Sequence, residues 1–212
     1  MNGQEQSLFE IFAKMGSMGQ FVSGLIFLLG GIAIYIFVER LSALKTRKED
    51  NNLLDKVNES ISLGNLTSAK DICMRANSPL SRVVYKGITR IGLPLKDVEL
   101  SMEKAIDLEV YQMEKGEETL SLVSKLAPML GFIGTIAGVI QIFYTINTTG
   151  DYNIESISGG LYVKMITSAL GLTLGIIAYF FYFVISKKIK GNVYHIEKGA
   201  AQLIETISTP GK

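Results

Sequence analysis

The sequence predicts an all-α membrane protein with three transmembrane helices, the second and third extended into the cytoplasm, and a helical cytoplasmic domain. Three stretches, residues 15–38, 126–150 and 165–186, contain no Asp, Glu, Lys, Arg or His. Each is long enough to cross a bilayer as a helix, and a buried helix hairpin of a soluble protein is the alternative. Four prolines in 212 residues and a mean hydropathy of +0.29 exclude a disordered or collagen-like chain.

Residues 21–38 are expected to form the first transmembrane helix, after a periplasmic N-terminal segment at 1–20. Twelve residues of this helix are Leu, Ile, Phe or Val, and together they favour insertion by roughly 4–7 kcal/mol. A secretory signal peptide would begin with basic residues and end at a small-residue cleavage site. Here the start carries Glu5 and Glu10, and the apolar run ends at Glu39-Arg40, so we interpret the segment as a permanent anchor.

Residues 39–125 are expected to form the cytoplasmic helical domain. One helix should end at Gly64, a second should be capped by Asn65 or Thr67 and run toward Ala76, and Ser78-Pro79 should open a third. The domain is electrically balanced, with fourteen Lys plus Arg against fourteen Asp plus Glu. It therefore presents no basic face for nucleic acid, and no nucleic acid partner is expected.

The second transmembrane helix is expected at residues 126–146. No strong helix breaker lies between Leu95 and Pro128, so this segment should be the membrane end of a much longer helix. Apolar residues recur along that helix at Val98, Met102, Ile106, Val110, Met113, Leu120 and Val123. Pro128 removes one backbone hydrogen bond and is expected to kink the helix.

A periplasmic loop at 147–160 should lead into the third transmembrane helix at 161–186 and a cytoplasmic C-terminal helix at 187–212. The C-terminal part carries apolar residues at alternating spacings of four and three, namely Ile189, Val193, Ile196, Ala200, Leu203 and Ile207. Such a seam needs a partner helix. Packing within the same chain and self-association between subunits are equally compatible with the pattern.

The distribution of basic residues predicts the orientation, since cytoplasmic loops are enriched in Lys and Arg. Only Lys14 and Lys164 lie on the side predicted to be outside. The basic residues flanking the three segments on the other side are Arg40, Lys45, Arg47, Lys48, Lys125, Lys187, Lys188 and Lys190. The N-terminus should therefore be periplasmic and the C-terminus cytoplasmic.

Small residues recur at four-residue intervals in the second and third segments and predict close, antiparallel packing of the two helices. The expected packing positions are Gly131, Gly134, Gly138, Gly171 and Gly175. Thr135, Thr167 and Ser168 lie among them. A hydroxyl in a bilayer commonly bonds a carbonyl one turn back, and a place in a pore wall is the other interpretation. The first segment should be a lipid-facing outer helix.

Composition gives little support to a cofactor or an enzyme. Cys73 is the single cysteine and the chain holds one histidine, so neither a disulfide nor a metal site is expected. No nucleophile and base at a recognisable spacing and no phosphate-binding loop is present. We therefore expect no metal, no cofactor and no catalytic residue.

Three stretches of the sequence resemble the MotA/TolQ/ExbB proton-channel family. LAPMLGFIGTIAGVI at 126–140 resembles the family signature, GLYVKMITSALGL at 160–172 is similar to its third membrane helix, and SPLSRVV at 78–84 is similar to its cytoplasmic region. The resemblance covers nearly the whole chain. It is closest to the ExbB/TolQ branch, because the flagellar-stator branch typically has four spans.

The resemblance implies a homopentamer in the bacterial inner membrane, surrounded by membrane lipids, with helices two and three around a central pore. The pore would enclose the single transmembrane helix of an ExbD/TolR-like partner. Thr135 matches the family's pore threonine, and Ser168, with Thr167 adjacent, falls where a second one is common. The family's glutamate near the outer start of helix three would fall at Val163, beside Lys164.

The charge-free stretches add a physical condition, because proton relay across a membrane usually needs an ionisable group at depth. The three stretches contain none, so the carboxylate is expected from the partner. The expected function is an ExbB-like channel subunit that converts the proton motive force into work on a TonB-like protein for outer-membrane import. A TolQ-like envelope energiser, a gliding or secretion motor subunit and a non-energised scaffold are alternatives, and the choice between H⁺ and Na⁺ stays open.

Overall fold

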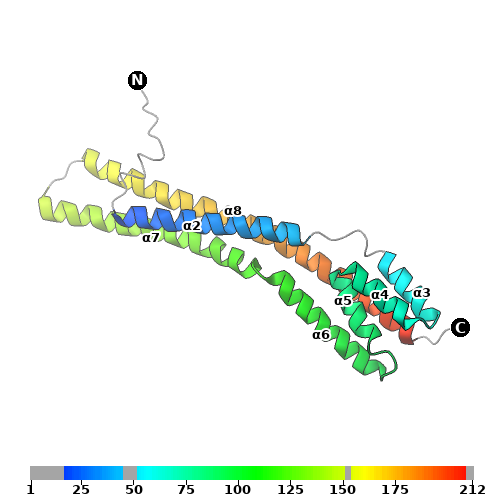
Figure 1. The fold of residues 1–212 in the computed structure, drawn as a ribbon. Helices are drawn as coiled ribbons and strands as arrows, with labels where there is room; N and C mark the ends of the chain where they lie inside the picture. Colours follow the sequence, from blue (N-terminus) through cyan, green and yellow to red (C-terminus); the bar gives the residue numbers. More distant parts are fainter. Residues whose placement is uncertain (1–16, 45–51, 151–153, 209–212) are drawn as a thin grey trace. The chain divides into compact units, whose positions relative to one another are not determined.

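The computed structural model describes residues 17–44, 52–150 and 154–208, without the side chains of Glu155, Ser156 and Val163. The regular elements of the described residues are α-helices (Figure 1). The chain divides into two compact units. The first holds the described parts of Met1–Arg40 and Gly116–Val184, and the second those of Leu41–Lys115 and Ile185–Lys212.

The first unit is built from three long apolar helices. These are α2 (Ser17–Ala43), α7 (Glu117–Thr149) and the first part of α8 (Ile154–Ser208), as Figure 1 shows. Three candidate membrane spans, Gly19–Ala43, Leu95–Thr149 and Ile157–Ser208, are long and apolar enough to cross a bilayer. Much of their apolar surface is exposed, for example Phe27, Phe132 and Ile176. The protein is a multi-pass membrane protein with three candidate spans, as the charge-free stretches predicted.

The second unit contains α3 (Leu53–Ser62), α4 (Leu66–Ala76), α5 (Pro79–Ile88), α6 (Leu95–Glu114) and the last part of α8. Asn65 caps α4 by accepting a hydrogen bond from the Ser68 N–H at 3.1 Å. Ser78 caps α5 through a reciprocal pair with Ser81, and Pro79 occupies the first turn. Local capping chemistry therefore places these helices where the sequence predicted them.

The apolar seam of α8 packs within the second unit. Ile189, Ile196, Ala200 and Leu203 are buried in the single chain. A Cβ on Gly87 would lie 3.0 Å from Leu203, and one on Gly199 would lie 2.5 Å from Leu80. The seam thus packs within the same chain, against α5 and against Leu54 of α3.

The long second helix differs from the prediction in one detail. The helix is interrupted at Lys115-Gly116, where Gly116 has φ of 84°, a conformation that L-residues avoid because of their Cβ. Pro128 lies inside α7, which is compatible with the predicted kink. The glycine at position 116 was not among the breakers that the sequence predicted.

The buried stripe of α6 matches the predicted one at Val98, Met102 and Met113 and differs only in the middle of the helix. It consists of Val98, Met102, Ala105, Glu109 and Met113. Ile106 and Val110 are only partly buried. The difference arises because a charged residue, Glu109, is buried by an ion pair that the hydrophobic pattern could not anticipate.

Candidate functional site

The candidate site is the contact between α7 and α8 in the first unit. A Cβ on Gly171 would lie 2.6 Å from the Ala127 backbone oxygen and 2.9 Å from the Gly131 Cα. Further along, Gly175 lies against Pro128 and Lys164 against Gly138. Residue numbers rise on one helix as they fall on the other, so the helices run antiparallel with their backbones in contact.

Helix α2 covers one side of this pair. Val22 of α2 lies 3.4 Å from the position that a Cβ on Gly134 of α7 would take. Leu174 of α8 lies 3.3 Å from the position that a Cβ on Gly30 of α2 would take. Phe37 of α2 stacks on Phe181 of α8 with ring centroids 4.0 Å apart and planes 11° apart. The other side of α2 is exposed, with Phe21, Phe27, Leu28, Ile34, Tyr35 and Val38.

The three hydroxyl residues divide between the two sides of the α7–α8 pair. Thr167 is 1% exposed and its methyl lies 3.4 Å from the Cβ position of Gly134, on the side that α2 covers. Thr135 follows Gly134 in α7, and Ser168 follows Thr167 in α8. One residue forward corresponds to a rotation of about 100° around a helix. Because the helices are antiparallel, one step forward on each turns toward the same side. Thr135 and Ser168 therefore share the side opposite α2, and both are partly exposed in the single chain.

The hydroxyl of Thr135 donates a hydrogen bond to the Gly131 carbonyl oxygen at 3.0 Å. This is the back-bond to the preceding turn that the sequence left as the ordinary interpretation of membrane hydroxyls. The lone pairs of the Thr135 oxygen stay available, so the side chain can accept a hydrogen bond from a donor that approaches from the open side. Thr173 makes the same back-bond to Ala169 at 2.8 Å on an exposed face.

Lys164 is the charged residue closest to this contact. It is 8% exposed, and its aliphatic stem lies against Gly138, where only a glycine leaves room for it. The sequence placed Lys164 as a flanking basic residue and did not anticipate its burial. The adjacent Val163, aligned with the family's glutamate, has a side chain outside the described residues.

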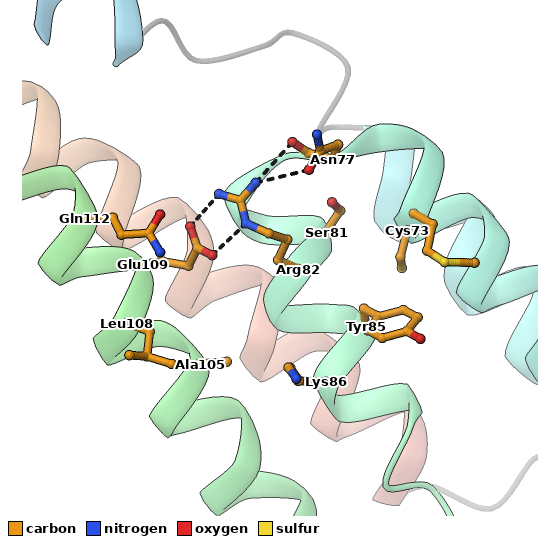
Figure 2. A pocket seen from close by; sticks show the side chains of 11 residues that line it. Cys73, Asn77, Ser81, Arg82, Tyr85, Lys86, Ala105, Leu108, Glu109 and Gln112 are labelled. Atoms are coloured by element: carbon orange, nitrogen blue, oxygen red, sulfur yellow. Dashed lines mark hydrogen bonds and ion pairs between the residues drawn. The ribbon is translucent and has the colours of Figure 1, made fainter.

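The second unit holds a separate polar cluster beside a pocket of about 400 Å³ between α4, α5 and α6 (Figure 2). Arg82 donates to both carboxylate oxygens of Glu109, with Nε to Oε1 at 2.6 Å and Nη2 to Oε2 at 2.5 Å. It also donates to the backbone oxygen of Asn77 at 3.2 Å. The hydrogen bond to Glu109 raises the pKa of Arg82, and the pair joins α5 to α6.

Cys73 lines the same pocket as a free, buried thiol. Burial raises the pKa of Cys73 to about 11, because the thiolate would lose its hydration. The thiol is therefore neutral at physiological pH and weakly nucleophilic.

Comparison with known proteins identifies the chain at the family level. The model of the MotA/TolQ/ExbB proton channel family matches residues 75–198, more than half of the chain. The chain belongs to the MotA/TolQ/ExbB proton channel family. The matched range contains Thr135, Ser168 and the whole α7–α8 contact, and the family is one of transporters, not of enzymes.

Individual relatives are named after ExbB. A biopolymer transport protein ExbB homolog of Methanothermobacter thermautotrophicus is 29% identical over 177 residues, 81% of this chain and 62% of that protein. ExbB of Pseudomonas putida is 26% identical over 111 residues, 52% of this chain and 34% of that protein. The matches therefore span about six tenths of the first protein and about a third of the second.

Proposed function

We propose that the chain is an ExbB-like subunit of a proton channel that, with an ExbD-like single-span partner, converts the proton motive force into mechanical work on a TonB-like protein for outer-membrane import. The observation that carries the proposal is the position of Thr135 and Ser168. Both residues are partly exposed in the single chain, on the side of the α7–α8 pair opposite α2, in a member of a proton channel family.

In this proposal a homopentamer turns the open sides of α7 and α8 toward a common lumen and α2 toward the lipid. The exposed apolar residues of α2 support this arrangement. Thr135 and Ser168 form the lumen wall as hydrogen-bonding groups, and Thr167 packs behind them. The glycines at 131, 134, 138, 171 and 175 allow the close packing that holds these hydroxyls in place.

We propose the bacterial inner membrane as the location, with the N-terminus periplasmic and both the helical domain between the first two spans and the C-terminal helix cytoplasmic. The basic residues that flank the three spans support this orientation. A cysteine placed after Lys212, in a Cys73→Ala background, should react with an impermeant maleimide only after the membrane is opened. Labelling in intact spheroplasts would show that the C-terminus is periplasmic and would contradict the proposed orientation.

The function is tested by reconstituting the chain with its single-span partner and measuring proton flux into vesicles. Thr135→Val and Ser168→Ala should each lower the flux at least tenfold, because the wall loses a hydrogen-bonding group. Thr173→Val is the matched control, since it removes the same kind of back-bond about 140° around α8 from Ser168. Unchanged flux in both wall variants, or equal loss in the control, would contradict the assignment.

A TolQ-like envelope energiser, a gliding or secretion motor subunit and a non-energised scaffold are the alternatives. The matching family description spans MotA, TolQ and ExbB proteins alike, which favours keeping the motor alternatives. Dissipating the proton gradient in cells separates energised roles from a scaffold, whose output would persist. Identifying the envelope protein bound by the partner then separates the energised roles from one another.

A further inference from the structure

The contacts of α2 and α8 with α7 define two levels along the first unit. At one end, a Cβ on Gly116 would lie 3.0 Å from Ile36 and 3.3 Å from Arg40. Glu39 and Arg40 are the charged residues that end the apolar run of α2. At the other end, Gly138 lies against the stem of Lys164, the charged residue that precedes the apolar run of α8.

These two levels are one bilayer apart. Gly116 and Gly138 are separated by 22 residues, which is about 33 Å along a helix at 1.5 Å per residue. The hydrocarbon core of a bilayer is about 30 Å thick. The charged residues of α2 and α8 thus lie about one bilayer thickness apart, which supports a membrane-crossing part of α7 from Gly116 to Gly138, a register that differs from the expected span at residues 126–146.

This register places Lys125 inside the hydrocarbon layer. It lies nine residues beyond Gly116, about 13 Å from that boundary and about 20 Å from the level of Gly138. The four-carbon stem of a lysine is too short to bring the ammonium group to either boundary. A lysine facing lipid at the centre of a helix costs about 2.5–3.5 kcal/mol on insertion scales, so this side chain needs a polar environment.

Lys125 lies on the side that carries Thr135. Lys125, Pro128, Phe132 and Thr135 recur at spacings of three, four and three residues, which form one stripe of a helix. Lys125 is exposed in the single chain. Its ammonium group therefore projects from the side opposite α2, about 15 Å along α7 from the Thr135 hydroxyl.

Within the described residues of the first unit, the helices supply no counter-charge at this depth. Between the two levels, α2, α7 and α8 carry acidic residues there only at Glu39, Glu117 and Glu118, all beside the Gly116 boundary. A second copy of the chain has the same sequence and would therefore also lack an acidic residue at this depth. A positive group in a low-dielectric layer is stabilised by an opposite charge, so the anion must belong to a different membrane helix.

We propose that Lys125 forms an ion pair with a carboxylate on the membrane helix of a second, different polypeptide that packs on the Thr135 side of α7. The partner is recognised by one Asp or Glu within its apolar span. This inference rests on the proposed function only in assuming that the channel encloses the membrane helix of a partner. It gives the chain an ionisable group, Lys125, beside the proposed proton path, which the charge-free stretches had not suggested.

The test uses the full chain and two synthetic single-span peptides, leucine-rich and identical except for one central Asp or Asn. Chain and peptide are mixed in detergent before reconstitution into phosphatidylcholine vesicles, and association is measured by energy transfer to a fluorophore at the C-terminus. At pH 7.5 the Asp peptide should bind at least tenfold more tightly than the Asn peptide. Lys125→Gln should abolish this difference, and Lys125→Arg should retain it.

Lys190→Gln and Lys164→Gln are the matched controls, and both should keep the preference for the Asp peptide. Equal binding of the two peptides, or a preference that survives in Lys125→Gln, would overturn the proposal. Proton flux is not part of this readout. A chain that discriminates between the peptides but conducts no protons with its partner would contradict the proposed function alone.

The depth of residue 125 gives a second measurement that needs no partner. A bimane attached to Lys125→Cys, in a Cys73→Ala background, should be quenched more strongly by nitroxides deep in the acyl chains than by headgroup nitroxides. Quenching by headgroup nitroxides alone would place Lys125 at the membrane surface and refute the register.

Discussion

Gly171 of α8 meets the backbone of α7 at Ala127, whose oxygen would lie 2.6 Å from a Cβ on the glycine. Backbone atoms cannot move aside as a flexible side chain can. The α7–α8 separation is therefore set by the absence of a side chain at this position, together with its neighbour Gly131.

Gly171→Ala should consequently destabilise the first unit by about 1–3 kcal/mol, because the added methyl forces the two helices apart. The measurement is the midpoint of thermal unfolding in detergent. Gly24→Ala in α2 is the control, since nothing lies within 4 Å of its Cβ position, and it should not lower the midpoint. Equal midpoints for Gly171→Ala and the control would mean that the contact is looser than described.

Gly116 should be intolerant of alanine for a conformational reason. Its φ of 84° lies in the left-handed region, which costs an L-residue roughly 1–2 kcal/mol, and the new methyl would also contact Ile36 at 3.0 Å. Gly191→Ala, within α8 and with open space around it, should be neutral or slightly stabilising. If Gly116→Ala unfolds at the wild-type temperature, the left-handed conformation is not required at this position.

Removing Arg82 should cost more than the exposure of its side chain suggests. Glu109 has a side chain only 9% exposed, so Arg82→Ala leaves a buried carboxylate without its cation. We expect a loss of about 2 kcal/mol in the free energy of unfolding, reduced from the fully buried case because Arg82 itself is 43% exposed. In a double-mutant cycle, Arg82→Met with Glu109→Met should recover part of the loss, and additive losses would show that the pair is not coupled.

The buried thiol of Cys73 should react slowly. With its pKa raised to about 11, the thiolate fraction at pH 8 is about two orders of magnitude below that of a free cysteine. The raised pKa favours the folded state while the thiol is neutral, so this contribution is complete below the unfolded value of 9.0 and is lost as pH rises to about 11. Maleimide labelling at pH 8 with and without denaturant measures the difference, and similar rates would contradict the burial.

Much of the helical architecture was predictable because its signals are local. Asn65, Ser78 and Pro79 act on backbone groups within one turn, and the sequence placed α4 and α5 correctly from them. The burial of Glu109 and of Lys164 was not predictable in this way. Each depends on a residue far along the chain, Arg82 in one case and Gly138 in the other.

The candidate site shows the same division. The spacing of glycines indicated that the second and third segments would pack closely and set Thr135 and Ser168 apart from Thr167, but spacing alone could not say which side of the helix pair α2 covers. The contact of Val22 with Gly134 decides this, since it places α2 on the side of Thr167.

The sequence by itself determined the helical class, the three apolar spans and the family, because these depend on composition, short-range periodicity and contiguous motifs. Only the tertiary structure decided which side of the α7–α8 pair α2 covers and which residues of α2 and α8 lie level with Gly116 and Gly138 of α7. Both depend on the register between helices that are distant in sequence, and that register is fixed by a few close contacts at glycines, which no local pattern records.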